Sequence, residues 1–262
     1  MTPSLARQGQ APGNSPARAT VLNLLDRSGL RGAARVCRRT LRQAGRQAVR
    51  HDQALVATYL AQADSPRLHI GCGPHLLPGW LNSDFDPASR AVLRLDATRR
   101  FPLPSSTFDA VFSEHMIEHV PFAGGAAMLA ECFRVLKPGG RIRITTPDLA
   151  FLLALYGPAP TPLQQAYLHW ASSTFVRGAP AGDPVFVINN YVRDWGHQFI
   201  YDDRTLRFAL EGAGFTQLER RLLNDSSDPT LRGLENTNRM PEGFLQLESI
   251  TLEAVKPRAA PR

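Results

Sequence analysis

Short apolar runs alternate with helical patterns between residues 65 and 257, and each run ends at a loop rich in polar residues or glycine. This alternation is typical of an α/β fold with a doubly wound, largely parallel sheet. We predict the first five strands at residues 67–70, 80–85, 91–95, 108–113 and 141–146. The closing strands are expected at 216–223 and 244–255, the latter with a bulge near residue 248.

The first connections of this sheet are unusually short. Only nine residues, 71–79, separate the first two predicted strands, and about five separate the second from the third. A parallel crossover usually needs a dozen residues or more, so we predict shortened crossovers early in the sheet. One later helix is expected to end at 137–140, and another is expected to begin at Asp148. Two more are expected at 161–175 and 202–213. Residues 149–200 lack a strand pattern and are expected to form a helical insertion over the sheet's carboxyl edge.

The net charge of +7 is unevenly distributed. Residues 1–50 contain ten arginines and one acidic residue, a charge of +9, so the rest of the chain carries −2. A nucleic-acid-binding domain would carry basic residues on its folded surface, so we expect no nucleic-acid partner. Residues 1–32 have the composition of a disordered tail, and 33–64 that of a helical extension. The arginines are expected on solvated helical faces, with weak contact to an anionic membrane surface or an acidic partner as the alternative.

The three cysteines, Cys37, Cys72 and Cys132, form no CxxC pair, which indicates neither a disulfide framework nor a zinc site. We therefore expect a cytoplasmic protein, with an organellar transit peptide as the alternative for its arginine-rich start. No apolar run approaches the roughly 20 residues that cross a bilayer.

Two glycines follow the first predicted strand in the segment LHIGCG, residues 68–73. Gly71, Cys72 and Gly73 would make a sharp turn that a ligand can approach without meeting a Cβ atom. In an open α/β sheet, ligands bind outside the carboxyl ends of the strands. The residues that end the neighbouring strands should therefore complete this site.

Polar residues end the next three predicted strands. Asp84 can accept two hydrogen bonds from a ribose diol, and the Asp96 carboxylate with the Ala97 N–H can pair with the edge of adenine. Ser113 and Glu114 end the fourth strand beside the glycine turn. Each acid alone is equally consistent with a turn or a helix cap. Their joint placement at adjacent strand ends favours a nucleoside site.

The segments LHIGCGPHLLPGWLNSDFDP, DATRRFPLPSSTFDAVFSEHMIEHV and ECFRVLKPGGRIRITTPDL follow one another in this order. With WGHQFIYDDRTLRFALEGAGF and SSDPTLRGLE, they resemble the motif series of class I S-adenosylmethionine-dependent methyltransferases, in particular a bacterial group called type 11. The resemblance covers residues 65–257. It implies a Rossmann-like sheet of seven strands, the last antiparallel, and S-adenosylmethionine as cofactor.

The resemblance also implies roles for the strand-end residues. The 71–73 turn would lie beside the methionine and ribose portions of the cofactor. Asp84 would bind the ribose hydroxyls, with Asp86 as the alternative, and Asp96 with Ala97 would bind adenine. The sequence departs from the family at His69, where relatives have an acid, and at His75, where they have a third glycine. Contacts to the amino-acid end of the cofactor are therefore less defined than those to the nucleoside.

The segment from His115 to His119 matches HxxEH, the motif of inverted zinc peptidases. That chemistry needs both histidines on one helical turn, whereas His115 directly follows a strand and Pro121 allows a helix only afterwards. We expect no metal and place Glu114, His115 and His119 at the rim of a nucleotide crevice. A zinc hydrolase is the remote alternative.

Methyl transfer to oxygen or nitrogen needs a group that removes a proton. His197 in the insertion is the first candidate base and His115 the second, with a structural role as the alternative for each. Tyr191 and Trp195 are expected to shape the acceptor site. The family analogy favours a small-molecule or glycan acceptor, and a catalytically inactive cofactor-binding module is the alternative function.

Overall fold

The computed structural model describes residues 49–258. The chain divides into two compact units, residues 1–51 and 52–262, and the structure describes mainly the second. The expected basic tail, 1–32, and residues 33–48 of the expected helical extension lie outside the described residues. Residues 49–62 are helical. Within 49–258, no helix is both long enough and apolar enough to cross a membrane.

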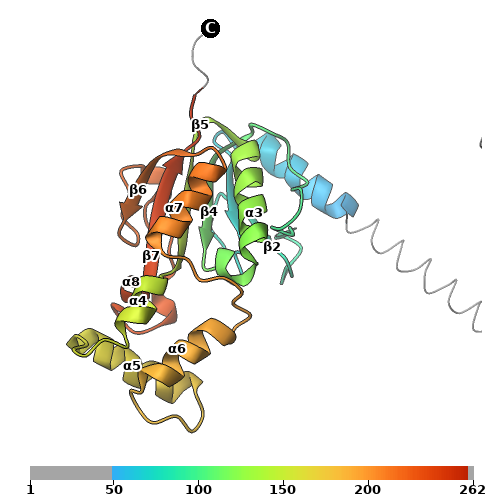
Figure 1. The fold of residues 1–262 in the computed structure, drawn as a ribbon. Coiled ribbons are helices and arrows are strands. Elements are labelled where there is room, and N and C mark those ends of the chain that lie inside the picture. The colour runs from blue at the N-terminus through green and yellow to red at the C-terminus, as the bar shows by residue number, and fades with distance from the viewer. Residues whose placement is uncertain (1–48, 259–262) are drawn as a thin grey trace, which may run out of the picture. The chain divides into compact units, whose positions relative to one another are not determined.

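Seven strands form one sheet in the order β3-β2-β1-β4-β5-β7-β6 (Figure 1). Strands β1 to β5 pair in parallel, whereas β7 is antiparallel to both β5 and β6. The predicted α/β sheet of seven strands with an antiparallel last strand is confirmed. The strands are β1 Arg67–Ile70, β2 Leu81–Asp84, β3 Leu93–Arg94, β4 Phe108–Glu114, β5 Leu136–Pro147, β6 Thr216–Arg221 and β7 Ser249–Val255.

The early crossovers contain no helix. Residues 71–80, 85–92 and 95–107, all described, connect the first four strands through turns alone. The amides of Gly71 and Cys72 both donate to the carbonyl oxygen of Ser83, at 2.9 and 3.0 Å, so the chain turns back at once toward β2. The predicted shortened crossovers are confirmed.

Helices cover one face of the sheet, as Figure 1 shows for α3 (Phe122–Val135) and α7 (Asp203–Gly212). Leu68, Ile70 and Val111 point into this layer and are fully or almost fully buried. The helical residues 49–62 contribute to the same core through Val56. This apolar layer supplies the main hydrophobic stabilisation of the sheet.

The opposite face, left without crossover helices, is covered by the segment that holds η2 (Pro229–Leu231) and η3 (Thr237–Arg239). Leu231 packs there against Phe112 of β4. Arg143 of β5 is fully buried and donates to Glu235 and Glu253, each at 2.6 Å. Buried charges need such paired partners, so this network fixes the segment against the sheet.

The chain after β5 forms α4 (Leu149–Ala154), α5 (Pro162–Phe175) and α6 (Pro184–Arg193), which lie beyond one end of the sheet with α8 (Phe244–Glu248) (Figure 1). These helices share a separate apolar core. Asp148 caps α4 and Thr161 caps α5 with a capping box, as helix N-termini require. The helical insertion after the fifth strand is present as predicted.

Two local predictions are wrong. Helix α3 ends at Val135, and β5 begins at Leu136, so residues 137–140 belong to the strand as an irregularity in its pairing with β4. The predicted bulge near residue 248 is a junction between α8 and β7. Phe244, Leu245 and Glu248 are buried at helical spacing, so the apparent shift of register reflects a change of period from helix to strand.

Candidate functional site

A cavity of about 630 Å³ lies outside the carboxyl ends of β1, β2 and β3, and we call it the strand-end cavity. Open α/β sheets bind ligands at this edge. Five residues predicted from the sequence to bind the cofactor line it: Gly71, Gly73, Asp84, Asp96 and Ala97. Its other lining residues are Ile70, Phe85, Leu95, Thr98, His115, Met116, His119, Val120 and Gln198.

The two glycines of the β1 turn are needed for different reasons. Both have left-handed backbone angles, with φ of +70° at Gly71 and +49° at Gly73. A Cβ atom on Gly71 would lie 2.3 Å from Cγ of Met116, so packing excludes a side chain there. A Cβ on Gly73 would meet no atom within 4 Å. Gly73 therefore leaves open space on the cavity wall for a ligand.

Asp84 and Asp96 hold the loops at the mouth of this cavity. The Asp84 carboxylate accepts from the amides of Gly73 and Asp86, both at 2.9 Å. Asp96 accepts from the amide and hydroxyl of Thr98, which lowers the pKa of its carboxyl. A carboxylate oxygen has more than one acceptor site, so each acid can still receive a donor from a ligand.

Three residues predicted for the cofactor do not line the strand-end cavity. Cys72 is buried, and burial raises the pKa of its thiol to about 11. Ser113 is buried within β4. The Glu114 carboxylate accepts from the amide of Asn236 at 3.2 Å and faces Arg239 at 3.6 Å. Because successive strand residues point to opposite faces, Glu114 is directed toward the segment that covers the helix-free face.

The insertion supplies a residue that the sequence analysis did not identify. Gln198 lines the strand-end cavity and donates through Nε2 to the carbonyl oxygen of His119 at 2.8 Å. The backbone amide of Gln198 donates to the carbonyl oxygen of Glu118 at 2.7 Å. In the sequence, Gln198 is only one residue of the WGHQFIY segment, and no local pattern marks it as a cavity residue.

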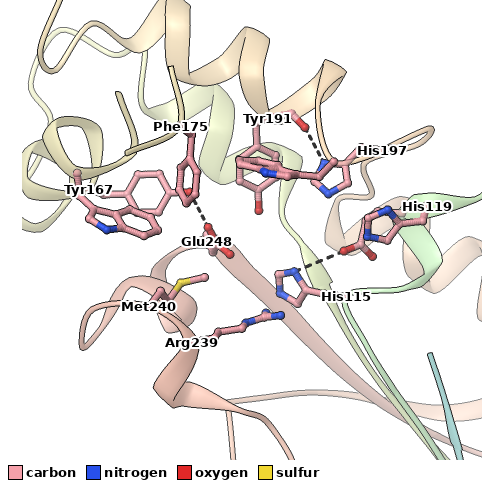
Figure 2. A pocket seen from close by; sticks show the side chains of 12 residues that line it. His115, His119, Tyr167, Phe175, Tyr191, His197, Arg239, Met240 and Glu248 are labelled. Carbon is pink, nitrogen blue, oxygen red and sulfur yellow. Dashed lines mark hydrogen bonds and ion pairs between the residues drawn. The ribbon is translucent and has the colours of Figure 1, made fainter. Parts of the chain in front are cut away.

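A second, smaller cavity of about 260 Å³ lies between the insertion and the sheet, and we call it the aromatic cavity. Figure 2 shows Tyr167, Phe175 and Tyr191 on one side of it, and Arg239 and Met240 on the other. Trp170 and Trp195 extend the aromatic wall. Aromatic walls offer large, rigid apolar contact area to a ligand.

Glu248 is a buried acid in this cavity. Its carboxylate accepts from the Tyr167 hydroxyl at 2.5 Å (Figure 2). Burial raises the pKa of Glu248 to about 7, and the nearby Arg239 guanidinium opposes part of that shift. Neither Glu248 nor Arg239 was a candidate from the sequence, because both lie in segments whose placement depends on packing against α5 and β7.

His115 and His119 line both cavities, whereas His197 lines only the aromatic cavity. His115 has a left-handed backbone, with φ of +45°, and its Nε2 lies 2.9 Å from the Ser249 hydroxyl. Burial lowers the pKa of His115 well below its usual value, and it also lowers the pKa of His119 and His197. All three rings are therefore neutral at neutral pH.

The HxxEH segment does not form one helical turn. His115 follows β4 directly, and the next element is η1, a single 3-10 turn at Ile117–His119. Among the residues that the structure describes, the three side chains whose ligand atoms lie within 4.8 Å of one another are Glu118, His119 and His197, without His115. The arrangement expected of an HxxEH zinc hydrolase is therefore not the one that this segment adopts.

Comparison with known proteins shows that part of the chain is similar to one family. Residues 68–144 match the family model described as a methyltransferase domain. A Mycolicibacterium smegmatis protein described as a probable S-adenosylmethionine-dependent methyltransferase is 35% identical over 74 residues. This match covers 25% of the chain and only 28% of that relative's length. The matched family segment contains the glycine turn, Asp84, Asp96 and η1.

Two solved structures align over more of the chain. A SAM-dependent methyltransferase from Archaeoglobus fulgidus has a TM-score of 0.44 and 17% identity, covering 78% of this chain and 92% of that one. Phosphoethanolamine N-methyltransferase 2 of Haemonchus contortus, solved with S-adenosyl-L-methionine, has a TM-score of 0.38 and 15% identity, covering 74% of this chain and 49% of that one.

Proposed function

We propose that this chain, whose residues 68–144 match a family model described as a methyltransferase domain, transfers a methyl group from S-adenosylmethionine to a small-molecule or glycan acceptor. The cofactor would occupy the strand-end cavity and the acceptor the aromatic cavity. The observation that carries this proposal is that His115 and His119 line both cavities. Methyl transfer requires donor and acceptor in line and in contact, and two adjoining cavities provide for that.

The residues of the strand-end cavity fit the cofactor. Asp84 offers carboxylate oxygens to a ribose diol, and Asp96 with the Ala97 amide offers an acceptor and a donor to adenine. The open space beside Gly73 admits the ligand next to the backbone. When bound, S-adenosylmethionine supplies an activated methyl group on a sulfonium ion. The chain itself has to bind, orient and exclude water.

His197 is the proposed proton acceptor in the aromatic cavity. Its Nδ1 lies 2.6 Å from the carbonyl oxygen of Tyr191, which can only accept, so Nδ1 carries the proton (Figure 2). Nε2 is then free to accept a proton from a hydroxyl or amine. The new bond joins acceptor oxygen or nitrogen to the methyl carbon as the carbon–sulfur bond breaks, and the proton passes to His197.

The size and walls of the aromatic cavity support this acceptor class. A volume of about 260 Å³ suits a small molecule or one sugar unit of a glycan. Flat apolar faces bind against the aromatic side chains, and Arg239 with Glu248 offers polar contacts at the far side. The negative charge of residues 51–262 supports an acceptor other than nucleic acid.

Calorimetric titration tests the cofactor half of the proposal. S-adenosylhomocysteine and S-adenosylmethionine should bind with one site per chain, whereas NAD should not bind. A labelled-methyl assay with phenols, amines, sugars and oligosaccharides then tests the acceptor half. Binding of NAD without either sulfur nucleoside would refute the proposed function, and binding without transfer to any acceptor would favour the inactive module.

A further inference from the structure

We propose that Glu118, His119 and His197 form a binding site for one divalent transition-metal ion, of the class of Zn²⁺, where the two cavities meet. One ligand atom from each residue lies within 4.8 Å of the others. The ligands of a tetrahedral zinc ion with bonds of about 2.1 Å lie roughly 3.4 Å apart. To hold the ion, the ligand atoms would therefore have to approach one another by at most about 1.4 Å. From the sequence we expected no metal, because among its histidines only those of the HxxEH segment match a metal-binding motif.

Backbone hydrogen bonds hold together the two segments that supply the ligands. The amides of Gln198 and Phe199 both donate to the carbonyl oxygen of Glu118, at 2.7 and 3.2 Å. The Gln198 side chain donates to the carbonyl oxygen of His119. The rings of His119 and His197 are 4.9 Å apart between centroids, so both histidines face the same space. The two segments are thus held together before any ion binds.

His197 has the kind of ring partner that metal-binding histidines usually have. The Nδ1–H of His197 donates to the Tyr191 carbonyl oxygen at 2.6 Å. The lone pair of Nε2 therefore remains for a metal ion. Metal-ligating histidines generally donate their second ring N–H to a carbonyl or carboxylate, which fixes the tautomer and the ring orientation.

Glu118 provides an independent observation that a cation belongs here. Its side chain is fully buried, and Oε2 accepts from the Thr146 hydroxyl at 3.0 Å. Oε1 is buried without a hydrogen-bond partner, and the nearest basic group is His115 Nδ1 at 3.4 Å. An unsatisfied buried carboxylate oxygen is costly. A metal ion between Oε1 and the two rings would satisfy it.

Two imidazole nitrogens and one carboxylate oxygen are the ligands of catalytic rather than structural sites. Such a set leaves one or more coordination positions open, and the ion's identity follows from geometry and availability. His119 borders the strand-end cavity as well as the aromatic cavity. An open position at this junction is accessible to an acceptor bound in the aromatic cavity.

This inference rests on the proposed function for its chemical role. A hydroxyl acceptor coordinated to the ion would lose its proton to water more readily, because the ion lowers the pKa of a bound oxygen acid. The oxygen then forms the bond to the methyl carbon while the carbon–sulfur bond breaks. In the metal-loaded protein the Nε2 lone pair of His197 is a ligand, and the ion replaces His197 as the activating group.

Metal binding can be measured without any methyl acceptor. The untagged full chain is dialysed to equilibrium against limiting Zn²⁺ after treatment with a chelator, and the retained ion is counted by mass spectrometry. We expect one ion per chain in the wild type. His119→Gln and His197→Gln should each weaken binding at least about tenfold. His169→Gln is the matched control, because His169 is exposed in the same insertion but lies outside the cluster.

Spectroscopy distinguishes loss of the metal site from failure of a variant to fold. Co²⁺ added to the wild type should give the absorption bands of a low-symmetry nitrogen and oxygen site, and Zn²⁺ should abolish them. Absence of stoichiometric binding by the wild type, or equal binding by all three variants with native circular dichroism, overturns the metal site. S-adenosylhomocysteine titration of the His197→Gln sample reports on the proposed function separately, because His197 does not line the strand-end cavity.

Discussion

The Nδ1 atom of His197 lies 2.6 Å from the carbonyl oxygen of Tyr191 and thereby fixes the tautomer of this histidine. The bond joins the end of α6 to the loop that follows it and turns Nε2 into the reactive atom. The same bond serves a base and a metal ligand equally well, since both roles need an unprotonated Nε2.

His197→Gln should lower kcat for methyl transfer by about 10²- to 10⁴-fold, because either proton removal or metal binding is lost. The measurement is the steady-state rate with the acceptor found in the labelled-methyl screen. The affinity for S-adenosylhomocysteine should stay unchanged, as His197 does not line the strand-end cavity. His169→Gln should keep full activity. An unchanged kcat in His197→Gln would assign this histidine a purely structural role.

Asp84→Ala should weaken S-adenosylhomocysteine binding by about 1–3 kcal/mol, because a ribose partner is lost and the Gly73 amide loses its acceptor. Asp96→Ala should have an effect of the same order through adenine. Calorimetric titration measures both. Asp86→Ala is the control, since the Asp86 side chain is 91% exposed. If the Asp86 variant alone lost affinity, the ribose site would have to be reassigned to it.

Gly71→Ala should destabilise the fold more than Gly178→Ala does. Both glycines have a left-handed backbone, with φ of +70° and +79°, which costs an alanine about 1–2 kcal/mol. Only at Gly71 would the new Cβ overlap another group, Cγ of Met116 at 2.3 Å. We expect a further loss of about 1–3 kcal/mol from this overlap. Urea unfolding of both variants gives the difference, and equal losses would contradict the packing argument.

The raised pKa of Glu248 predicts a dependence of stability on pH. The folded protein holds this proton up to about pH 7, whereas the unfolded chain releases it near the ordinary value of 4.5. Between these values the folded state binds more protons, so the free energy of unfolding falls as pH rises. The stabilisation that this proton gives the folded state is complete below pH 4.5 and is lost above about pH 7.

Glu248→Gln should therefore flatten the decline in stability between pH 4.5 and 7, since the amide keeps an acceptor for the Tyr167 hydroxyl and does not ionise. Urea unfolding across this range, with a chelator present, measures the slope for both proteins. Parallel curves for wild type and variant would show that Glu248 does not carry the proton.

Much of the sheet could be predicted because strands and turns depend on local patterns. The first strand was placed at its observed bounds, and the loops after it are too short to hold helices. Asp84 and Asp96 could be assigned to one cavity because parallel strands end at the same edge of a sheet. Ser113 and Glu114 follow the same logic but point into other surroundings, since side chains alternate along a strand.

The aromatic cavity could not be predicted from the sequence. Its walls come from α5, α6, the segment around Arg239 and Met240, and Glu248 at the end of α8. The residue patterns of these segments report only that each is a helix or a turn. Which of their faces meet depends on packing between distant parts of the chain.

The sequence by itself determined the α/β class, the short early crossovers and the acids at the strand ends, because periodicity and turn chemistry act over a few residues. Tertiary structure alone decided that His197 lies beside Glu118 and His119. The HxxEH motif would require two histidines on one helical turn, but the sequence already placed His115 directly after a strand, and in the structure its ring lies against Ser249. Long-range packing of the insertion onto η1 then supplied a different histidine.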